Sequence, residues 1–167
     1  MSEDRKLTGK VAMVFGGSRG IGSAAARRLA REGANVGVTY VSAADKAAET
    51  IRAIEEEGRT GFAIKADSAD PTAIHDAVTQ TVAQLGRLDI VVVSAGILRR
   101  GDLQSVSLQE LDLMLNVNVR GVFLAIQAAA AHLSEGGRVI TIGSNTAVRC
   151  GYPGSSVYAM TDRKSVV

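Results

Sequence analysis

The sequence has little cysteine, histidine or aromatic side chain, and these shortages exclude several kinds of site. Cys150 is the one cysteine among 167 residues, which excludes an internal disulfide framework and a cysteine-based metal site. The two histidines, His75 and His132, stand far apart in helix-like segments and lack the spacing of metal ligands. Aromatic residues make up only 4% of the chain. We therefore expect no metal and no cysteine chemistry.

Excess charge and long apolar runs are also missing. The formal net charge is +2 and is spread evenly, which argues against a nucleic acid or an anionic membrane as partner. The charged start MSEDRK is followed by no apolar segment of the kind found in secretory signals. The longest apolar run, 121–131, is shorter than a membrane span. We expect a cytoplasmic protein whose partner is a small molecule.

What is present is a regular alternation of strand-like and helix-like segments separated by glycines. Short apolar runs predict strands and apolar residues at helical spacing predict helices. The predicted strands are 11–15, 35–41, 60–66, 88–94 and 138–142, and the predicted helices are 21–32, 43–57, 71–85 and 107 to about 133. This order predicts an α/β fold with a Rossmann-like, doubly wound parallel sheet and right-handed crossovers.

Two helix starts are marked by capping residues. Asp70 precedes Pro71, so the carboxylate can cap free amides while proline occupies a position where its missing N–H is harmless. Ser107 and Glu110 have the spacing of a capping box and predict the start of the long helix. Gly136 and Gly137 are expected to separate that helix from the fifth strand.

The first strand is followed by the glycine-rich stretch GGSRGIG, in which Gly16, Gly20 and Gly22 follow the pattern G-x-x-x-G-x-G. Such a loop lets backbone N–H groups approach a pyrophosphate, and the following helix N-terminus favours negative charge. Strand-to-helix turns also use glycine for packing alone, so the loop by itself leaves both interpretations open. Its place directly after the first strand favours a dinucleotide site.

The second strand indicates which dinucleotide. An NAD site usually has an acid at the end of this strand, but here the strand ends in Tyr40, Val41 and Ser42, and the first acid is Asp45. Arg19 lies within the glycine loop, where a guanidinium can bind a 2′-phosphate. Arg19 and Ser42 therefore favour NADP(H) over NAD(H). The alternative is that Arg19 is only a solvated loop residue.

The glycine loop, SAG at 94–96, NVNV at 116–119, TIGS at 141–144 and Tyr158 occur in an order that resembles the short-chain dehydrogenase/reductase family. Among its members the chain is most similar to 3-oxoacyl-carrier-protein reductases, and the resemblance covers residues 7 to about 161. The resemblance implies hydride transfer between a nicotinamide cofactor and a carbonyl or alcohol. It also implies a homo-oligomer for the intact protein.

The resemblance assigns cofactor-binding roles to residues beyond the glycine loop. Asp67 and Ser68 match the pair that holds the adenine ring. Ser94, Ala95 and Gly96 match the turn beside the ribose, although Val93 and Ser94 stand where the family has two asparagines. The implied cofactor residues are Gly16, Ser18, Arg19, Gly20, Ile21, Gly22, Tyr40, Ser42, Asp67, Ser68, Ser94, Ala95 and Gly96.

The resemblance also implies three catalytic residues. Tyr158 matches the general acid/base, Ser144 the serine that bonds the substrate oxygen, and Asn118 the asparagine of the long helix, where relatives have a helix irregularity. Asn116 is the rival to Asn118, but the Arg-Gly-Val-Phe that follows aligns Asn118. A proton donor is needed because hydride addition leaves negative charge on the carbonyl oxygen.

Position 162 departs from the family, which has a lysine one helical turn after the tyrosine. That lysine lowers a phenol pKa that is ordinarily about 10, whereas the carboxylate of Asp162 should raise it. Relatives also continue for about 80–90 residues, within the usual size of one domain.

We therefore expect residues 1–161 to be an incomplete dinucleotide-binding domain. Residues 162–167, DRKSVV, read as the translation of a common sequencing adapter and are expected to be a non-native tail. The fifth strand should then be an exposed sheet edge, and the chain as written should be inactive.

Two other interpretations remain. Some family members with similar GGSRGIG and DSAD segments are associated with binding a cyclic dinucleotide rather than with turnover, but Asn118, Ser144 and Tyr158 together favour an enzyme. The other interpretation, for the literal chain, is a structural fragment without activity. The substrate cannot be identified from these residues, since its contacts fall partly in the Leu98–Arg100 loop and partly beyond this chain.

Overall fold

A computed structural model describes residues 5–149 and 152–162, so Cys150 and residues 163–167 of the predicted tail lie outside the described residues. Five strands form one sheet in the order β3-β2-β1-β4-β5, and every neighbouring pair is parallel. The strands are β1 (Val11–Phe15), β2 (Asn35–Tyr40), β3 (Gly61–Lys65), β4 (Leu88–Val93) and β5 (Leu133–Thr141). The predicted doubly wound sheet is confirmed, with β5 at its edge as expected.

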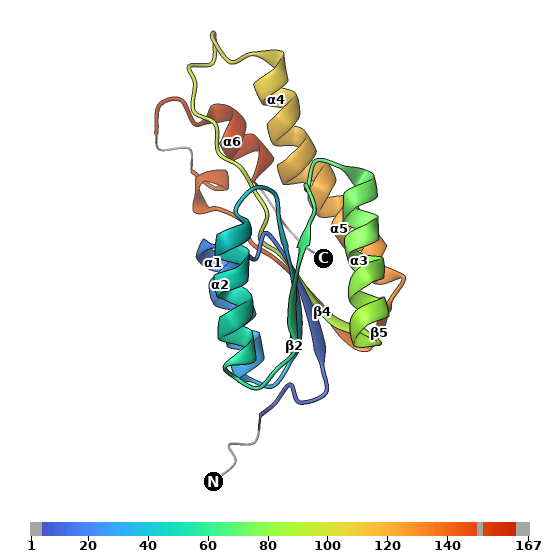
Figure 1. The fold of residues 1–167 in the computed structure, drawn as a ribbon. Helices are drawn as coiled ribbons and strands as arrows, with labels where there is room; N and C mark the ends of the chain where they lie inside the picture. Colours follow the sequence, from blue (N-terminus) through green and yellow to red (C-terminus); the bar gives the residue numbers. More distant parts are fainter. Residues whose placement is uncertain (1–4, 150–151, 163–167) are drawn as a thin grey trace.

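The helices cover both faces of the sheet. Figure 1 shows α1 (Gly20–Arg31) and α2 (Ala44–Glu55) on one face, and α3 (Pro71–Leu85) and α5 (Gly121–Ala130) on the other. The shorter α4 (Leu108–Leu115) and α6 (Ser156–Thr161) stand beyond the carboxyl ends of the strands. Ligands of open parallel sheets bind at this end.

Each face of the sheet has its own apolar core. Along β1, Met13 and Phe15 point into the core beneath α3 and α5, whereas Ala12 and Val14 point into the core beneath α1 and α2. Side chains alternate between faces along a strand, so a strand covered on both sides must be apolar throughout. The uninterrupted apolar runs in the sequence follow from this double cover.

Both predicted helix caps are present. The Asp70 carboxylate accepts hydrogen bonds from the backbone N–H groups of Thr72 and Ala73, and Pro71 is the first residue of α3. The Ser107 side chain accepts from the N–H of Glu110, whose carboxylate accepts in return from the N–H of Ser107. These side chains satisfy amides that have no partner within the helix.

The predicted end of the long helix and the predicted start of the fifth strand were wrong. The helix ends at Ala130, and β5 begins at Leu133 rather than Arg138. Leu133 pairs with Leu88, and Arg138 pairs with Ile90, so the intervening residues form a bulge that contains Gly136 and Gly137. The glycines therefore lie inside the strand instead of separating helix from strand. Gly136 adopts φ +79°, a backbone conformation that glycine provides in a bulge.

The long helix is also not uniform. Between α4 and α5 lies a π-helical turn, Asn116–Arg120, so the helical stretch is continuous but locally underwound. By length and composition alone, the 23-residue stretch Leu108–Ala130 could cross a membrane. Here α5 contacts α3 and β4, and Val122, Ala125 and Ala129 belong to the core. The stretch is therefore a core helix of the doubly wound fold.

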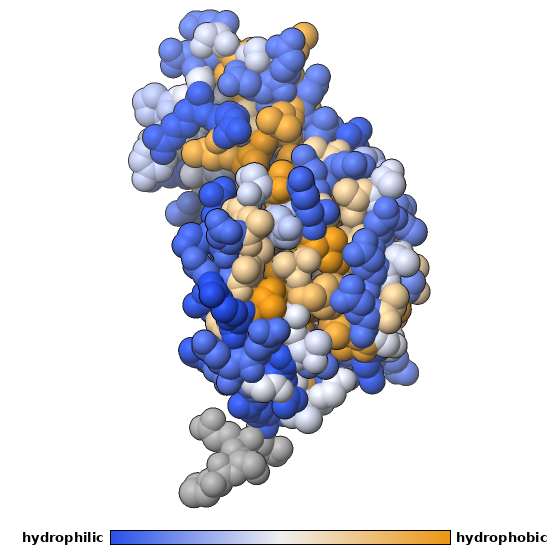
Figure 2. All heavy atoms as spheres, viewed as in Figure 1, coloured by the Kyte–Doolittle hydropathy of each residue, from blue (hydrophilic) through white to orange (hydrophobic). Residues whose placement is uncertain are grey.

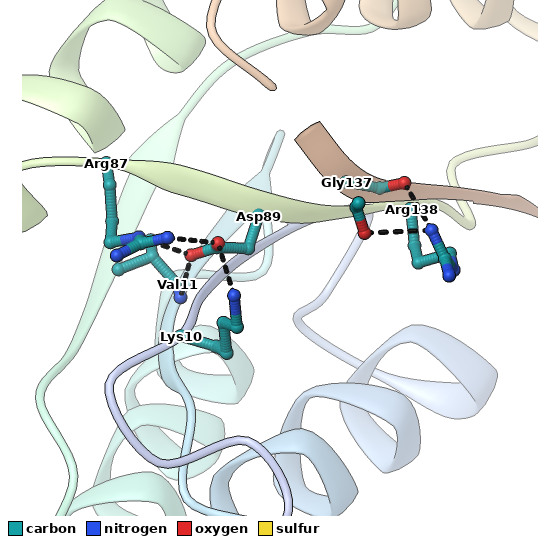
Figure 3. A network of polar contacts seen from close by, with 7 residues as sticks. Lys10, Val11, Arg87, Asp89, Gly137 and Arg138 are labelled. Atoms are coloured by element: carbon teal, nitrogen blue, oxygen red, sulfur yellow. Dashed lines mark hydrogen bonds and ion pairs between the residues drawn. The ribbon is translucent and has the colours of Figure 1, made fainter. Parts of the chain in front are cut away.

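The amino end of the sheet is held by a buried carboxylate. Figure 3 shows Asp89 of β4 between Arg87, Lys10 and the backbone N–H of Val11. Arg87 bonds both oxygens of Asp89, at 2.8 and 2.7 Å, and Lys10 lies 3.1 Å from one of them. These contacts join β4 to the start of β1 at the end of the sheet opposite α4 and α6.

Figure 2 shows the distribution of apolar residues on the face of the molecule seen in Figure 1. Hydrophilic residues cover the outer surfaces of α2 and α3, and apolar residues gather in the band between these helices. A second apolar area lies between α4 and α6. Apolar surface is thus present at the end of the sheet where parallel α/β folds bind ligands.

Candidate active site

A cleft of about 690 Å³ opens at the carboxyl end of the sheet. It is lined by most of the residues that the sequence singled out, from the glycine loop to α6. Of those residues, Gly20, Gly22 and Asn118 do not line it. The predicted residues that do are Gly16, Ser18, Arg19, Ile21, Tyr40, Ser42, Asp67, Ser68, Ser94, Ala95, Gly96, Ser144 and Tyr158.

Glycines shape the wall of the cleft because side chains would not fit. Gly16 has φ +75°, and a Cβ there would lie 2.8 Å from the Cα of Ala95. A Cβ on Gly22 would lie 2.3 Å from the carbonyl oxygen of Gly16, so α1 can pack closely on the loop only when residue 22 is glycine. Gly20 has φ +57°. The loop therefore presents bare backbone to the cleft.

The first turn of α1 faces this loop without a side-chain cap. Arg19 is the N-cap residue in an extended conformation, and no described side chain caps the helix or adds an acid to its first turn. The last turn carries Arg28 and Arg31, which complement the helix dipole. Uncapped N–H groups at the amino end of a helix bind anions. The geometry therefore suits a phosphate.

Basic and hydroxyl side chains gather where β2 ends. Arg19, Tyr40 and Ser42 all line the cleft, whereas Asp45 lies in the first turn of α2 and is absent from the lining. Arg19 forms no ion pair with any residue that the structure describes. A guanidinium that forms no ion pair with a described residue is suited to an additional phosphate.

The loop after β3 also contributes to the wall of the cleft. Asp67 lines the cleft, and its carboxylate accepts a hydrogen bond from the N–H of Ala69 at 2.9 Å, which shapes the turn before α3. Ser68 packs against the long helix at Gly121, where a Cβ would lie 2.1 Å from the Ser68 carbonyl oxygen. Gly121 was not singled out from the sequence, and only this contact shows why it lacks a side chain.

Thr39 of β2 was also missed. Its side chain is buried and lines the cleft, its Oγ1 accepts a hydrogen bond from the N–H of Gly16 at 2.9 Å, and its carbonyl accepts from Gly17 at 3.0 Å. Thr39 thus holds the glycine loop from the neighbouring strand. The available signal was a hydroxyl residue within an otherwise apolar strand that is buried on both faces.

Asn118 lies in the π-helical turn and is 1% exposed. Its Oδ1 accepts from the N–H of Ile97, and its Nδ2 donates to the Ile97 carbonyl, both at 2.9 Å. Nδ2 also donates to Oγ1 of Thr161 at 3.0 Å. The predicted helix irregularity is present at this residue. Asn118 stands behind the cleft wall and joins the loop after β4 to α6.

Ser144 and Tyr158 both line the cleft and are hydrogen-bonded to each other. Ser144 follows β5, and its hydroxyl lies 2.8 Å from that of Thr146. The Tyr158 hydroxyl donates a hydrogen bond to the carboxylate of Asp162, which is 5% exposed. Burial and the bond to Asp162 raise the pKa of Tyr158, and the hydrogen bond with Ser144 acts in the opposite direction. The phenol is thereby held in its protonated form.

The sheet order, the glycine loop and the position of the cleft define a Rossmann-type dinucleotide fold. The family profile described as short chain dehydrogenase matches residues 10–161. The chain belongs to the short-chain dehydrogenase family.

Several relatives match almost the whole chain. Versicolorin reductase 1 of Aspergillus parasiticus is 42% identical over 159 residues, covering 95% of this chain and 61% of the relative. Elsinochrome reductase 1 of Elsinoe fawcettii is 40% identical over 156 residues, covering 93% of this chain and 58% of the relative. The chain therefore spans about three fifths of the length of these curated relatives.

Solved structures agree with the sequence comparison. A short chain dehydrogenase from Burkholderia cenocepacia J2315 in complex with NADP is 50% identical, with a TM-score of 0.92 over 94% of this chain and 64% of that chain. A blue fluorescent protein from a metagenomic library in complex with NADPH is 47% identical, with a TM-score of 0.90 over 94% of this chain and 64% of that chain.

Proposed function

We propose that the chain is the dinucleotide-binding part of an NADP(H)-dependent oxidoreductase whose substrates are small carbonyl compounds or alcohols. The proposal depends chiefly on one observation: a single cleft is lined both by residues at an uncapped helix N-terminus and by a paired serine and tyrosine. Relatives that are named reductases, and similar structures in complex with NADP or NADPH, support it.

The residues present fit a dinucleotide. The bare backbone between Gly16 and Gly22 leaves room for a pyrophosphate where a Cβ would clash, and the first turn of α1 offers its N–H groups. Arg19 and Ser42 supply a guanidinium and a hydroxyl for a 2′-phosphate, and the lining residues that follow β2 include no acid. These features favour NADP(H) over NAD(H).

Nicotinamide supplies hydride transfer when it is bound, and the remaining chemistry falls to this chain's side chains. Ser144 would hold the substrate oxygen by a hydrogen bond, and Tyr158 would donate a proton to that oxygen as negative charge develops there. Asn118, buried behind the wall, fixes the loop after β4 that borders the same cleft.

Asp162 limits proton transfer by Tyr158 in this chain. A phenol whose proton is held by a carboxylate and by burial exchanges that proton poorly near neutral pH. We therefore propose that residues 1–161 bind cofactor and that the chain as written reduces carbonyl compounds negligibly. The same hydrogen bond favours one rival function, a regulatory protein that binds a nucleotide, such as a cyclic dinucleotide, without turnover.

Binding and turnover assays separate these functions. We expect NADPH to bind the purified chain at least about tenfold more tightly than NADH, and Arg19→Ala to remove that difference. Arg27→Ala is the matched control, because Arg27 is exposed on the same helix and does not line the cleft. Equal affinity for NADPH and NADH in the unmodified chain would contradict the cofactor assignment.

The rival is tested with the gene completed to the length of its relatives and carrying lysine at position 162. NADPH oxidation by this protein with a panel of ketones and quinones supports the enzyme. Tight binding of a cyclic dinucleotide, without NADPH oxidation for any carbonyl compound, would establish the regulatory function instead.

A further inference from the structure

Thr161 is a buried hydroxyl residue at the end of α6 to which no role in the reaction has been given. It is 2% exposed and follows Tyr158 by three residues. Its Oγ1 donates a hydrogen bond to the Tyr158 carbonyl at 3.1 Å and accepts one from Nδ2 of Asn118 at 3.0 Å. One buried side chain thus contacts both residues that flank the proposed reaction chemistry.

The partner of Thr161 is Asn118, and every polar group of its carboxamide already has a hydrogen-bond partner. The Asn118 carboxamide uses its oxygen and one N–H on the backbone of Ile97 and directs its other N–H at Thr161. These bonds leave the amide no other orientation with the same number of partners. The π-helical turn, the loop after β4 and α6 therefore meet at one buried point, and Thr161 is the contribution from α6.

Helix α6 needs an external attachment because it is only six residues long and has no side-chain cap among the described residues. Helices of this length are not stable alone. Two backbone hydrogen bonds hold the segment nearby: Ser144 N–H to the Asp162 carbonyl at 3.4 Å, and Gly101 N–H to the Gly154 carbonyl at 3.1 Å. Neither of them involves a side chain of α6, so the hydrogen bond between Thr161 and Asn118 adds a buried side-chain attachment that they do not supply.

Residues three apart in a helix lie on neighbouring positions of one side. A rotation of α6 that moved Thr161 away from Asn118 would also move the Tyr158 phenol relative to Ser144 on its separate loop. We propose that Thr161 is a positioning residue, whose hydroxyl seats α6 on Asn118 and thereby places the Tyr158 phenol beside Ser144. The proposal rests on the function proposed above, in which Tyr158 is the proton donor.

The test is the titration of Tyr158 in the purified chain, followed by NMR of ring-labelled tyrosine and assigned with Tyr158→Phe. Thr161→Val keeps the shape and removes the hydroxyl, whereas Thr161→Ser keeps the hydroxyl. Because the hydrogen bond with Ser144 lowers the pKa of Tyr158, we expect Thr161→Val, which lets the phenol move away from Ser144, to raise that pKa further. We expect Thr161→Ser to titrate as the unmodified chain does.

Thr81→Val is the matched control for loss of a buried hydroxyl. Thr81 is fully buried and donates to the Ala77 carbonyl at 2.8 Å within α3, far from the cleft lining. We expect it to leave the Tyr158 titration unchanged. A folded Thr161→Val chain with an unchanged Tyr158 titration would overturn the proposal, and so would a serine variant that behaves as the valine variant does.

A second measurement covers the case in which Thr161→Val does not fold. In the unmodified chain, the side-chain N–H protons of Asn118 should exchange with water far more slowly than those of exposed Gln104. Equal exchange rates would disprove the bond to Thr161. Neither measurement requires bound cofactor, so failure of NADPH to bind would refute the proposed function and leave this test intact.

Discussion

The hydroxyl of Tyr158 donates a hydrogen bond to the carboxylate of Asp162, one helical turn further along the chain. Burial and this carboxylate raise the pKa of Tyr158, and the hydrogen bond with Ser144 only partly opposes them. The spacing of the two residues in the sequence predicts that Asp162 raises the pKa of Tyr158. A site with this arrangement retains its proton where an oxidoreductase needs to exchange it.

Asp162→Lys is expected to lower the pKa of Tyr158, where Asp162 raises it. An ammonium group one turn from the phenol stabilises the phenolate, so the pKa of Tyr158 should fall below its ordinary value of about 10. The measurement is the alkaline absorbance titration of tyrosine, compared with Tyr158→Phe. Asp162→Asn, which removes the charge and keeps the size, should give an intermediate value. A Tyr158 pKa above 10 in the lysine variant would contradict this account.

The prediction that residues 162–167 are not native is tested separately, by sequencing the coding DNA. Codons that differ from the adapter sequence would disprove it. In that case Asp162 would be a native neighbour of Tyr158, and the rival function of binding without turnover would gain support.

Much of the fold followed from local chemistry. Asp70 and Pro71 predicted the first residue of α3, because proline and a capping carboxylate act within one turn. The apolar strands were predictable because a sheet covered on both faces needs apolar residues throughout. Most of the predicted cofactor residues line one cleft because the carboxyl ends of parallel strands meet at one edge.

The remaining features depend on contacts distant in the sequence. Gly136 was predicted to precede a strand, but the strand starts earlier, because Leu133 finds a partner in Leu88 and the glycines are accommodated as a bulge. Thr39 and Thr161 make hydrogen bonds to Gly16 and Asn118, which are distant in the sequence, and no local pattern reveals such partners. The structure was needed to find them.

Asp89 should make the free energy of unfolding of the chain depend on pH in the acidic range. Burial works to raise its pKa, but hydrogen bonds from Arg87, the Val11 N–H and Lys10 outweigh burial and hold the pKa below its ordinary value. A carboxyl with a lowered folded-state pKa stabilises the fold above its unfolded-state pKa, and this contribution is lost as the pH falls through the folded-state pKa. Stability should therefore decline below about pH 4.

Asp89→Asn is expected to lower the free energy of unfolding at pH 7 by about 1–3 kcal/mol, since charge-assisted hydrogen bonds are lost. It should also flatten the acid dependence. Urea denaturation at several pH values measures both effects. Glu49→Gln is the control, because its ion pair with Lys46 is exposed and screened by solvent and should contribute little to stability. An asparagine variant with the original acid dependence would show that other carboxylates are responsible.

Gly22→Ala should abolish dinucleotide binding. The added Cβ would lie 2.3 Å from the Gly16 carbonyl oxygen, so α1 must move away from the loop and its N–H groups must leave the phosphate position. NADPH affinity, measured by fluorescence titration, should fall at least about 100-fold, as expected for a displaced phosphate site.

Gly86→Ala separates this local effect from general destabilisation. Gly86 has φ +79°, so alanine is strained there, but the Cβ meets nothing within 4 Å and the residue lies at the far end of α3. We expect this variant to melt at a lower temperature and to bind NADPH as the unmodified chain does. Normal NADPH binding by Gly22→Ala would show that the loop does not hold the phosphates.

Ser42→Asp should exchange the cofactor preference. Ser42, which follows β2, lines the cleft together with Arg19, and Asp45 on α2 does not line it. A carboxylate at residue 42 would repel a 2′-phosphate and could accept hydrogen bonds from the hydroxyls of an unphosphorylated ribose. We expect NADPH to bind at least about tenfold more weakly and NADH more tightly. Ser42→Asn provides the uncharged control and should weaken NADPH binding less. If the aspartate variant kept the original preference, the 2′-phosphate would have to be recognised by residues other than Arg19 and Ser42.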